Sequence, residues 1–158
     1  MRHSGRVKLR NVLFPIWFLY LYPPLWLYVI PANFLIDSAV LLLAAHRLRL
    51  PEKKTLWKRC IVKLWAVGFA ADFIGGALTL VLWMALMGVM ENGAALMLFP
   101  GTTLTAIPGT ALAGFLIYVL NRKFTFRCTE LTEQQVHKIC LAMAVFTAPY
   151  LMLVPLYG

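Results

Sequence analysis

Long apolar runs separated by short basic segments dominate the pattern of this 158-residue chain. Three runs are clear, over about residues 61 to 89, 94 to 120 and 137 to 157. Each run reaches or exceeds the roughly 20 residues that a helix needs to cross a bilayer. The pattern therefore predicts an all-α, polytopic transmembrane helix bundle in which these three runs are spans.

A fourth apolar stretch, residues 11 to 46, is too long for one straight span and is interrupted by Pro23, Pro24 and Pro31. Two arrangements fit it. One is a tight hairpin of two legs that turns between Pro23 and Pro31, and the basic residues at both ends of the stretch favour it. The other is an interfacial helix at 11 to 22 followed by one span at 25 to 46, which the dense aromatic residues favour. We prefer the hairpin, and expect four to five membrane-embedded segments in a single domain covering 1 to 158.

A faint internal repeat is also present. The pattern Pro-x6-Ile-Pro-small begins at Pro23 and again, 77 residues later, at Pro100. Each copy leads into an apolar run, a basic loop and a further span. This order favours a direct repeat of a two-helix unit, since parallel repeats are common in transporters. Chance similarity between apolar helices accounts for the pattern nearly as well.

Composition and charge agree with a membrane protein. Hydrophobic residues make up 61% of the chain and charged residues 13%, and the formal net charge is +9. The basic residues fall in three clusters, at 2 to 10, 47 to 63 and 122 to 138, whereas the connection around Glu91 has none. This asymmetry predicts an integral protein of the plasma (cytoplasmic) membrane with its basic loops cytoplasmic. The expected partners are the lipid bilayer, with anionic headgroups at the basic loops, and a second copy or another membrane protein. Nucleic acid is not expected, because no soluble fold remains to present a basic surface.

The residues that could carry cofactor or enzyme chemistry are few. The spacing of Cys128, His137 and Cys140 matches none of the usual zinc patterns, and a fourth ligand is missing. Ser4 and Ser38 are the only serines, and neither belongs to a recognisable nucleophile–base motif. We therefore expect no metal, no cofactor and no enzymatic activity.

Residues 118 to 126, Tyr-Val-Leu-Asn-Arg-Lys-Phe-Thr-Phe, resemble the Asn-basic-basic-aromatic-x-Phe helix end of the GtrA-like membrane proteins. The resemblance implies a small four-span protein associated with moving lipid-linked sugars. It covers nine residues of 158, and we assign no family from it.

Two acids, Asp37 and Asp72, lie inside long apolar stretches that contain no Lys or Arg. Counted inward from Arg47 and Lys63, they are ten and nine residues deep. That depth is roughly 14 to 15 Å, near the middle of a hydrocarbon core about 30 Å thick. Because an acid at this depth is costly, it usually faces water or protein and marks an ion, proton or substrate path. We expect the two acids to meet at the midplane.

Other polar and small residues extend this candidate pathway. The segment 99 to 110 carries two Pro-Gly steps, and we expect an interrupted helix there whose freed carbonyls line a polar cavity. Small residues near Asp72 predict close approach of a neighbouring helix. The candidate pathway residues are Asp37, Asp72, Asn33, Thr103, Thr110, Tyr118 and Asn121, and the expected helix-packing residues are Gly68, Gly75 and Gly76.

These features predict a small oligomeric channel or transporter that passes a cation, a proton or a small polar solute past midplane acids. The alternative is a non-transporting anchor, assembly or regulatory subunit whose acids are protonated clamps between helices. A pathway needs both acids on a wet surface, whereas clamps need each acid bonded and dry.

Overall fold

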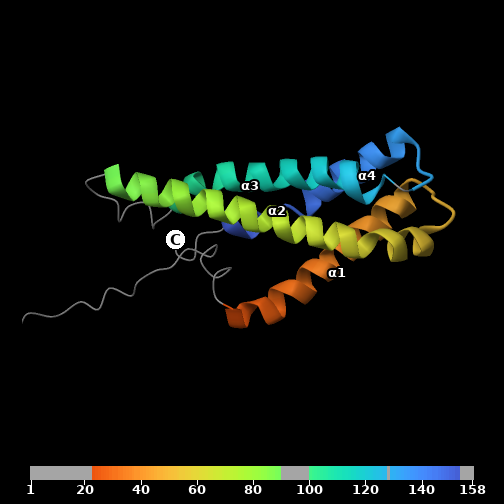
Figure 1. Ribbon diagram of the computed structural model, residues 1–158, viewed down its shortest axis with the longest axis horizontal. Coiled ribbons are helices and arrows are strands. Elements are labelled where there is room, and N and C mark those ends of the chain that lie inside the picture. Colours follow the sequence, from red (N-terminus) through yellow and green to blue (C-terminus); the bar gives the residue numbers. More distant parts are fainter. Residues whose placement is uncertain (1–22, 90–99, 128, 154–158) are drawn as a thin grey trace, which may run out of the picture.

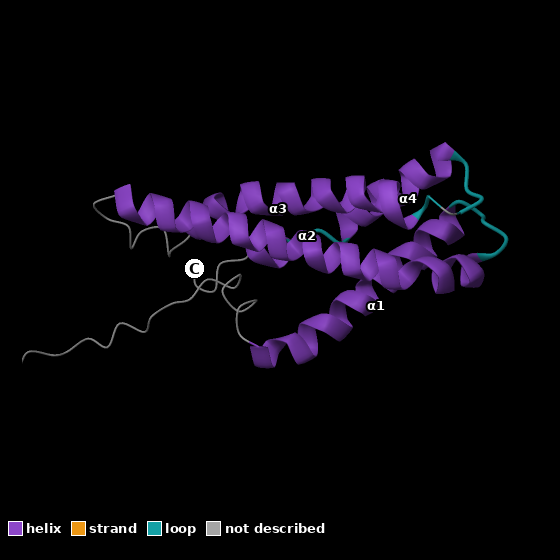
Figure 2. Ribbon diagram, viewed as in Figure 1, coloured by secondary structure: helices purple, strands orange, loops and turns teal. Residues whose placement is uncertain are grey.

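The computed structural model describes residues 23–89, 100–127 and 129–153, and every regular element in them is helical (Figures 1 and 2). The described part of the chain is therefore all-α, as predicted. The elements are α1 (Pro23–Arg47), α2 (Lys53–Val89), α3 (Gly101–Leu120), the π-helix η3 (Asn121–Thr125), α4 (Glu133–Phe146) and the 3-10 helix η4 (Tyr150–Leu153).

Helices α2 and α3 run side by side along the longest axis, and α1 and α4 pack against them toward one end (Figure 1). We term this the basic end: α1 ends there at Arg47, and α2 and α4 begin there, near Lys53 and Lys138. Toward Pro23, α1 diverges from the other helices (Figure 1). Two of its large side chains, Leu27 and Tyr28, are 77% and 75% exposed in this diverging part.

Among the described residues, three helices are long and apolar enough to span a membrane: Leu27–Arg47, Lys53–Val89 and Gly101–Thr125. The second and third contain the predicted spans at 61 to 89 and 94 to 120, except that residues 94 to 99 lie outside the described part. Of the predicted span at 137 to 157, residues 154 to 157 lie outside the described part, and the rest is not one continuous helix. α4 has 14 residues, or about 21 Å of helix, which is too short to cross a bilayer.

Two predicted interruptions are wrong because helices continue through their prolines. α1 runs unbroken from Pro23 to Arg47 with Pro31 inside it, so residues 23 to 31 do not form the turn of a hairpin. Residues 11 to 22 lie outside the described part. α3 likewise contains Pro108, so it is not interrupted there. A proline removes one backbone hydrogen bond of a helix and leaves the others in place, and membrane helices tolerate it.

The helix that does break is α4, at residues 147 to 149. The backbone N–H and the side-chain hydroxyl of Thr147 both donate to the Met143 carbonyl, at 2.9 and 2.8 Å, and close the last turn. Pro149 has no N–H to extend the helix. The chain then turns tightly, with Tyr150 N donating to the Ala148 carbonyl at 2.7 Å, and η4 follows.

Local sequence explains how the connections at the basic end are made. After α1, Arg49 adopts the left-handed conformation, with φ 53°, and Leu50 N donates to the Ala45 carbonyl at 3.0 Å. This is a common way to satisfy the last carbonyls of a helix. α4 begins with a capping box, in which Thr132 and Gln135 exchange side-chain to backbone hydrogen bonds.

The main hydrophobic core lies toward the basic end, where all four helices meet. Its largest members are at most 1% exposed: Leu41, Leu64, Ile117, Ile139 and Met143. A smaller cluster of Ala106 and Met152 lies under η4. The bundle is therefore dry and well packed at one end, and the candidate site lies just beyond this core.

The α2–α3 crossing is closer than side chains would allow. A Cβ built on Gly75 would lie 2.5 Å from the Gly109 carbonyl oxygen and 3.0 Å from the Ala113 Cβ. A Cβ on Gly109 would overlap the Gly75 carbonyl and the Thr79 hydroxyl. Glycine at both positions lets the two backbones touch, as small residues do in many membrane bundles.

Candidate functional site

Asn33 and Asp37 of α1 face Asp72 and Gly68 of α2 in two successive antiparallel pairs. Asn33 Nδ2 donates to Asp72 Oδ2 at 3.3 Å. One turn nearer the basic end, the Asp37 carboxyl lies over Gly68, where an added Cβ would be 3.3 Å from Asp37 Oδ2. Beyond these pairs, the interface continues into the apolar core. The next polar contact between the two helices is the exposed one at the basic end, where Lys53 Nζ lies 3.0 Å from His46 Nδ1.

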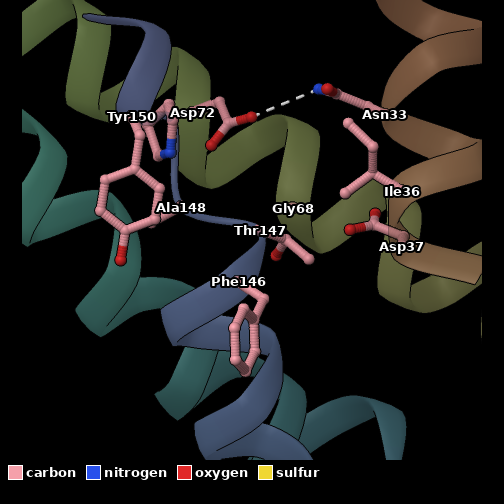
Figure 3. A pocket seen from close by; sticks show the side chains of 10 residues that line it. Asn33, Ile36, Asp37, Gly68, Asp72, Phe146, Thr147, Ala148 and Tyr150 are labelled. Carbon is pink, nitrogen blue, oxygen red and sulfur yellow. Dashed lines mark hydrogen bonds between the residues drawn. The ribbon is translucent and has the colours of Figure 1, made fainter. Parts of the chain in front are cut away.

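The structure brings the two acids together, as the equal depths of Asp37 and Asp72 predicted. They are 4% and 5% exposed and line one cavity of about 110 Å³, which has room for a few water molecules. Figure 3 shows the two carboxyl groups and Thr147 around this space. We term it the acid cavity; its lining residues are Asn33, Ile36, Asp37, Gly68, Asp72, Phe146, Thr147, Ala148, Pro149 and Tyr150.

Both carboxyl groups keep unused hydrogen-bonding capacity. Within the described residues, Asp72 Oδ1 is buried and has no hydrogen-bond partner. Asp37 and Thr147 line the same cavity, but the Thr147 hydroxyl already donates its hydrogen to the Met143 carbonyl. Its oxygen is left as an acceptor, so a hydrogen bond between the two requires the proton to come from Asp37. The acids are thus not a fully satisfied polar network.

The electrostatic character of the acid cavity is negative. Asp37 and Asp72 line the same small cavity, and two neighbouring carboxylates do not both stay ionised without a counter-charge. The end of α4 adds the negative pole of a helix and carbonyls that lack an intrahelical partner. Among the described residues, no basic side chain lines the cavity. The arrangement therefore favours a proton or a cation that accepts oxygen ligands.

In this conformation the acid cavity is closed toward the basic end. Toward the basic end, Leu41, Leu64 and Met143 form an apolar layer in which each side chain is at most 1% exposed. The rim of the acid cavity is formed by Ile36 of α1 and by Phe146 at the end of α4, which are 48% and 69% exposed. The cavity thus opens between α1 and the broken helix, and the described residues do not form a continuous pore.

The other candidate pathway residues lie elsewhere along α3 and η3. Thr103 donates to the Leu153 carbonyl at 2.9 Å and holds η4 against α3. Thr110 is buried, and its hydroxyl has no hydrogen-bond partner in the described part of the chain. From Thr103 to Asn121 is 18 residues, or about 27 Å along a helix, so these side chains cannot all share one site, and none of them lines the acid cavity.

Tyr118 and Asn121 lie at the basic end. The Tyr118 hydroxyl is 2.8 Å from His137 Nδ1 and accepts a hydrogen bond from Arg122 Nη1 at 3.1 Å, which links α3 to α4. Asn121 is fully buried in η3 and accepts from the Thr125 hydroxyl at 2.7 Å. The acid cavity therefore gathers Asn33, Asp37 and Asp72 of the predicted set, without the residues from α3.

Sequence reasoning missed the contribution of the broken helix. A usable signal was present, because Thr147 lies nine residues from Lys138, as Asp72 lies nine residues from Lys63. Counting inward from each basic cluster would have placed Thr147 and Pro149 at the depth of the acids. The Pro-Gly steps of 99 to 110 predicted an interrupted helix in that segment, whereas the helix that breaks beside the acids is α4.

Within the described residues, no group of three or more His, Cys, Asp or Glu side chains could hold a metal ion. Comparisons of the chain with protein-family models, curated proteins and solved structures gave no match.

Proposed function

We propose that this protein is a membrane transporter that binds a proton or a small monovalent cation between Asp37 and Asp72. The observation that supports the proposal is the buried, unpartnered Asp72 Oδ1, in a cavity shared with a second carboxyl group and the end of a broken helix. Transporters often build cation sites near the midplane from interrupted helices and their free carbonyls. Catalysis is not part of the proposal.

The apolar layer of Leu41, Leu64 and Met143 favours a carrier over an open channel. A channel needs a continuous polar path, whereas a carrier exposes its site to one side at a time. In this conformation the basic end is closed. Transport would then require α1 or α4 to move, so that the apolar layer at the basic end opens while the rim of the acid cavity at Ile36 and Phe146 closes.

We further propose that the basic end is cytoplasmic, in the plasma membrane, because basic loops are retained on that side. A cysteine placed at Asn92 should react with an impermeant reagent added to intact cells, and one placed at Lys54 should react only after permeabilisation. Labelling of Lys54→Cys in intact cells would show that the basic end lies outside and that the proposed orientation is wrong.

The finer architecture is also a proposal. With α4 and η4 as a broken fourth segment, α1–α2 and α3–α4 would be two copies of one unit. Supporting this, Pro23 begins α1 and Pro100 precedes α3. The exposed apolar face of α1 around Leu27 would be covered by another copy in an oligomer.

The second candidate function is a non-transporting membrane subunit. The hydrogen bond from Asn33 to Asp72 favours it, because it joins α1 to α2 across their interface. Such bonds contribute about 0.6 kcal/mol on average between membrane helices. In this case the acids would hold the bundle together, and the protein would move no ion or solute across the membrane.

The decisive experiment compares purified variants in reconstituted vesicles, assayed for proton and monovalent-cation flux and for thermal stability. Asp72→Asn keeps the size of the side chain and removes its charge, so flux should fall while folding survives. Asp72→Leu should lose flux and also stability, because Asn33 is left unpaired. Glu130→Gln removes an exposed acid outside the cavity and should leave flux unchanged.

Two results would overturn the transport proposal. One is wild-type vesicles that show no flux above empty vesicles under any imposed gradient, with Asp72→Asn as stable as wild type and Asp72→Leu not. The other is an equal loss of flux in Asp72→Asn and Glu130→Gln, since the loss would then not depend on the acid cavity.

A further inference from the structure

A second hollow, separate from the acid cavity, lies between α1 and α4 at the basic end. Its volume is about 440 Å³. Apolar side chains, among them Leu43, Ala142 and Phe146, line most of it, and Leu43 and Phe146 are 63% and 69% exposed. We term it the α1–α4 groove. The groove is exposed and largely apolar, and it lies on a surface that faces lipid if α1 spans the membrane.

The groove is charged at one end only. Arg47, the last residue of α1, and Lys138, in the second turn of α4, line it at the basic end. From Lys138 to Phe146 is eight residues, so the apolar part runs about 12 Å away from the charges. Among the described residues, no acidic side chain lines the groove. Its walls thus change from cationic to apolar along the membrane normal.

That gradient matches the chemistry of one class of ligand. An anionic phospholipid carries its phosphate at the membrane surface and its acyl chains directed inward. Arg guanidinium groups pair with phosphate oxygens through two parallel hydrogen bonds, and Lys adds a point charge. Basic pockets between membrane helices are known to hold anionic headgroups. A soluble anion would use the charges but leave the apolar walls exposed.

We propose that the α1–α4 groove binds one anionic phospholipid, with its phosphate between Arg47 and Lys138 and an acyl chain along Ala142 to Phe146. Phe146 also lines the acid cavity, so the bound chain contacts the residue at which α4 ends. The site does not depend on transport, because it rests on the groove and its two charges alone.

The test measures lipid binding to the purified full-length protein in neutral detergent, by native mass spectrometry and by thermal stability. The added lipids are phosphatidylglycerol and phosphatidylcholine, with glycerol phosphate as a soluble headgroup. Wild type should retain phosphatidylglycerol and gain stability from it more than from phosphatidylcholine. The double variant Arg47→Gln/Lys138→Gln should bind phosphatidylglycerol about thirtyfold more weakly, because each of the two basic residues near the surface contributes about 1 kcal/mol to such attraction.

Two further variants separate this site from general basic charge. Lys54→Gln/Lys58→Gln removes the same charge from exposed positions on α2 that line no described groove, and should bind as wild type. Ala142→Trp fills the groove and leaves both charges, and should also weaken binding.

Equal weakening in the Lys54/Lys58 pair would overturn the proposal, since any surface charge would then suffice. Equal retention of phosphatidylcholine, or full binding by Ala142→Trp, would do the same, because the phosphate contacts or the groove would then be irrelevant. Stability gained from glycerol phosphate alone would identify a soluble anion site in its place.

Discussion

α2 makes two interfaces that use glycine in opposite ways. Against α3, Gly75 meets Gly109 and the backbones touch, so there is no room for even one added carbon atom. Against α1, Gly68 leaves space that the Asp37 carboxyl occupies, next to a cavity. The first interface fixes two helices together, and the second keeps polar groups and space in the middle of the bundle. A glycine in a membrane helix therefore indicates a close approach, but not whether backbone or a functional side chain approaches.

The largest expected effect is at the tight interface. Gly109→Ala should destabilise the protein by about 3 kcal/mol, because the new Cβ meets backbone and a hydroxyl that have nowhere to move. Unfolding in detergent would measure it. Gly88→Ala is the matched control in α2, since an added Cβ there meets nothing within 4 Å. If the two variants had similar melting temperatures, the α2–α3 contact at Gly109 would be no tighter than an open position on α2. The distinction between the two interfaces would then not hold.

At the acid cavity, Gly68→Ala should affect function more than stability. The added Cβ would lie 3.3 Å from Asp37 Oδ2, a tight contact that a side chain can relieve by a small shift. We expect a loss of about 1 kcal/mol and a clear fall in flux. If flux is unchanged although Asp37 has been displaced, the position of that carboxyl does not matter to transport.

The variant Asn33→Ala tests whether the acids line a pathway or clamp α1 to α2. The hydrogen bond to Asp72 is long, at 3.3 Å, so its loss should cost about 0.6 kcal/mol, the average for bonds between membrane helices. The comparison uses denaturant unfolding of wild type and the variant. A cost of several kcal/mol would favour the clamp and the structural subunit.

The smallest effect is expected for Gly76→Ala. An added Cβ there would lie 3.5 Å from the Met152 Cε, an ordinary contact with a flexible side chain. Stability should change by no more than about 0.5 kcal/mol. A large loss would mean that η4 packs against α2 more rigidly than the contact of Met152 suggests.

What could be predicted from the sequence follows from the fixed thickness of a bilayer. Helical rise converts residue counts into depth, and so the equal depths of Asp37 and Asp72 predicted their meeting. The same count places Thr147 beside them. Asn33 precedes Asp37 by four residues, a spacing that places both on one face of a helix, and both line the acid cavity.

What could not be predicted concerns which prolines break a helix. Pro31 and Pro108 lie inside helices, whereas α4 ends three residues before Pro149. The local chemistry of each proline is the same, so the outcome depends on packing around it. Thr103 and Tyr118 are likewise bound to particular neighbours, Leu153 and His137, that no one-dimensional pattern specifies.

The depth of the acids has an electrical consequence. Asp37 and Asp72 lie about halfway through the hydrocarbon core if the basic clusters mark its edge. A cation that reaches them from one side crosses about half of the membrane voltage, worth about 1.2 kcal/mol per 100 mV. The affinity of the cavity for the cation would then change about sevenfold per 100 mV, and the voltage would favour loading from the positive side.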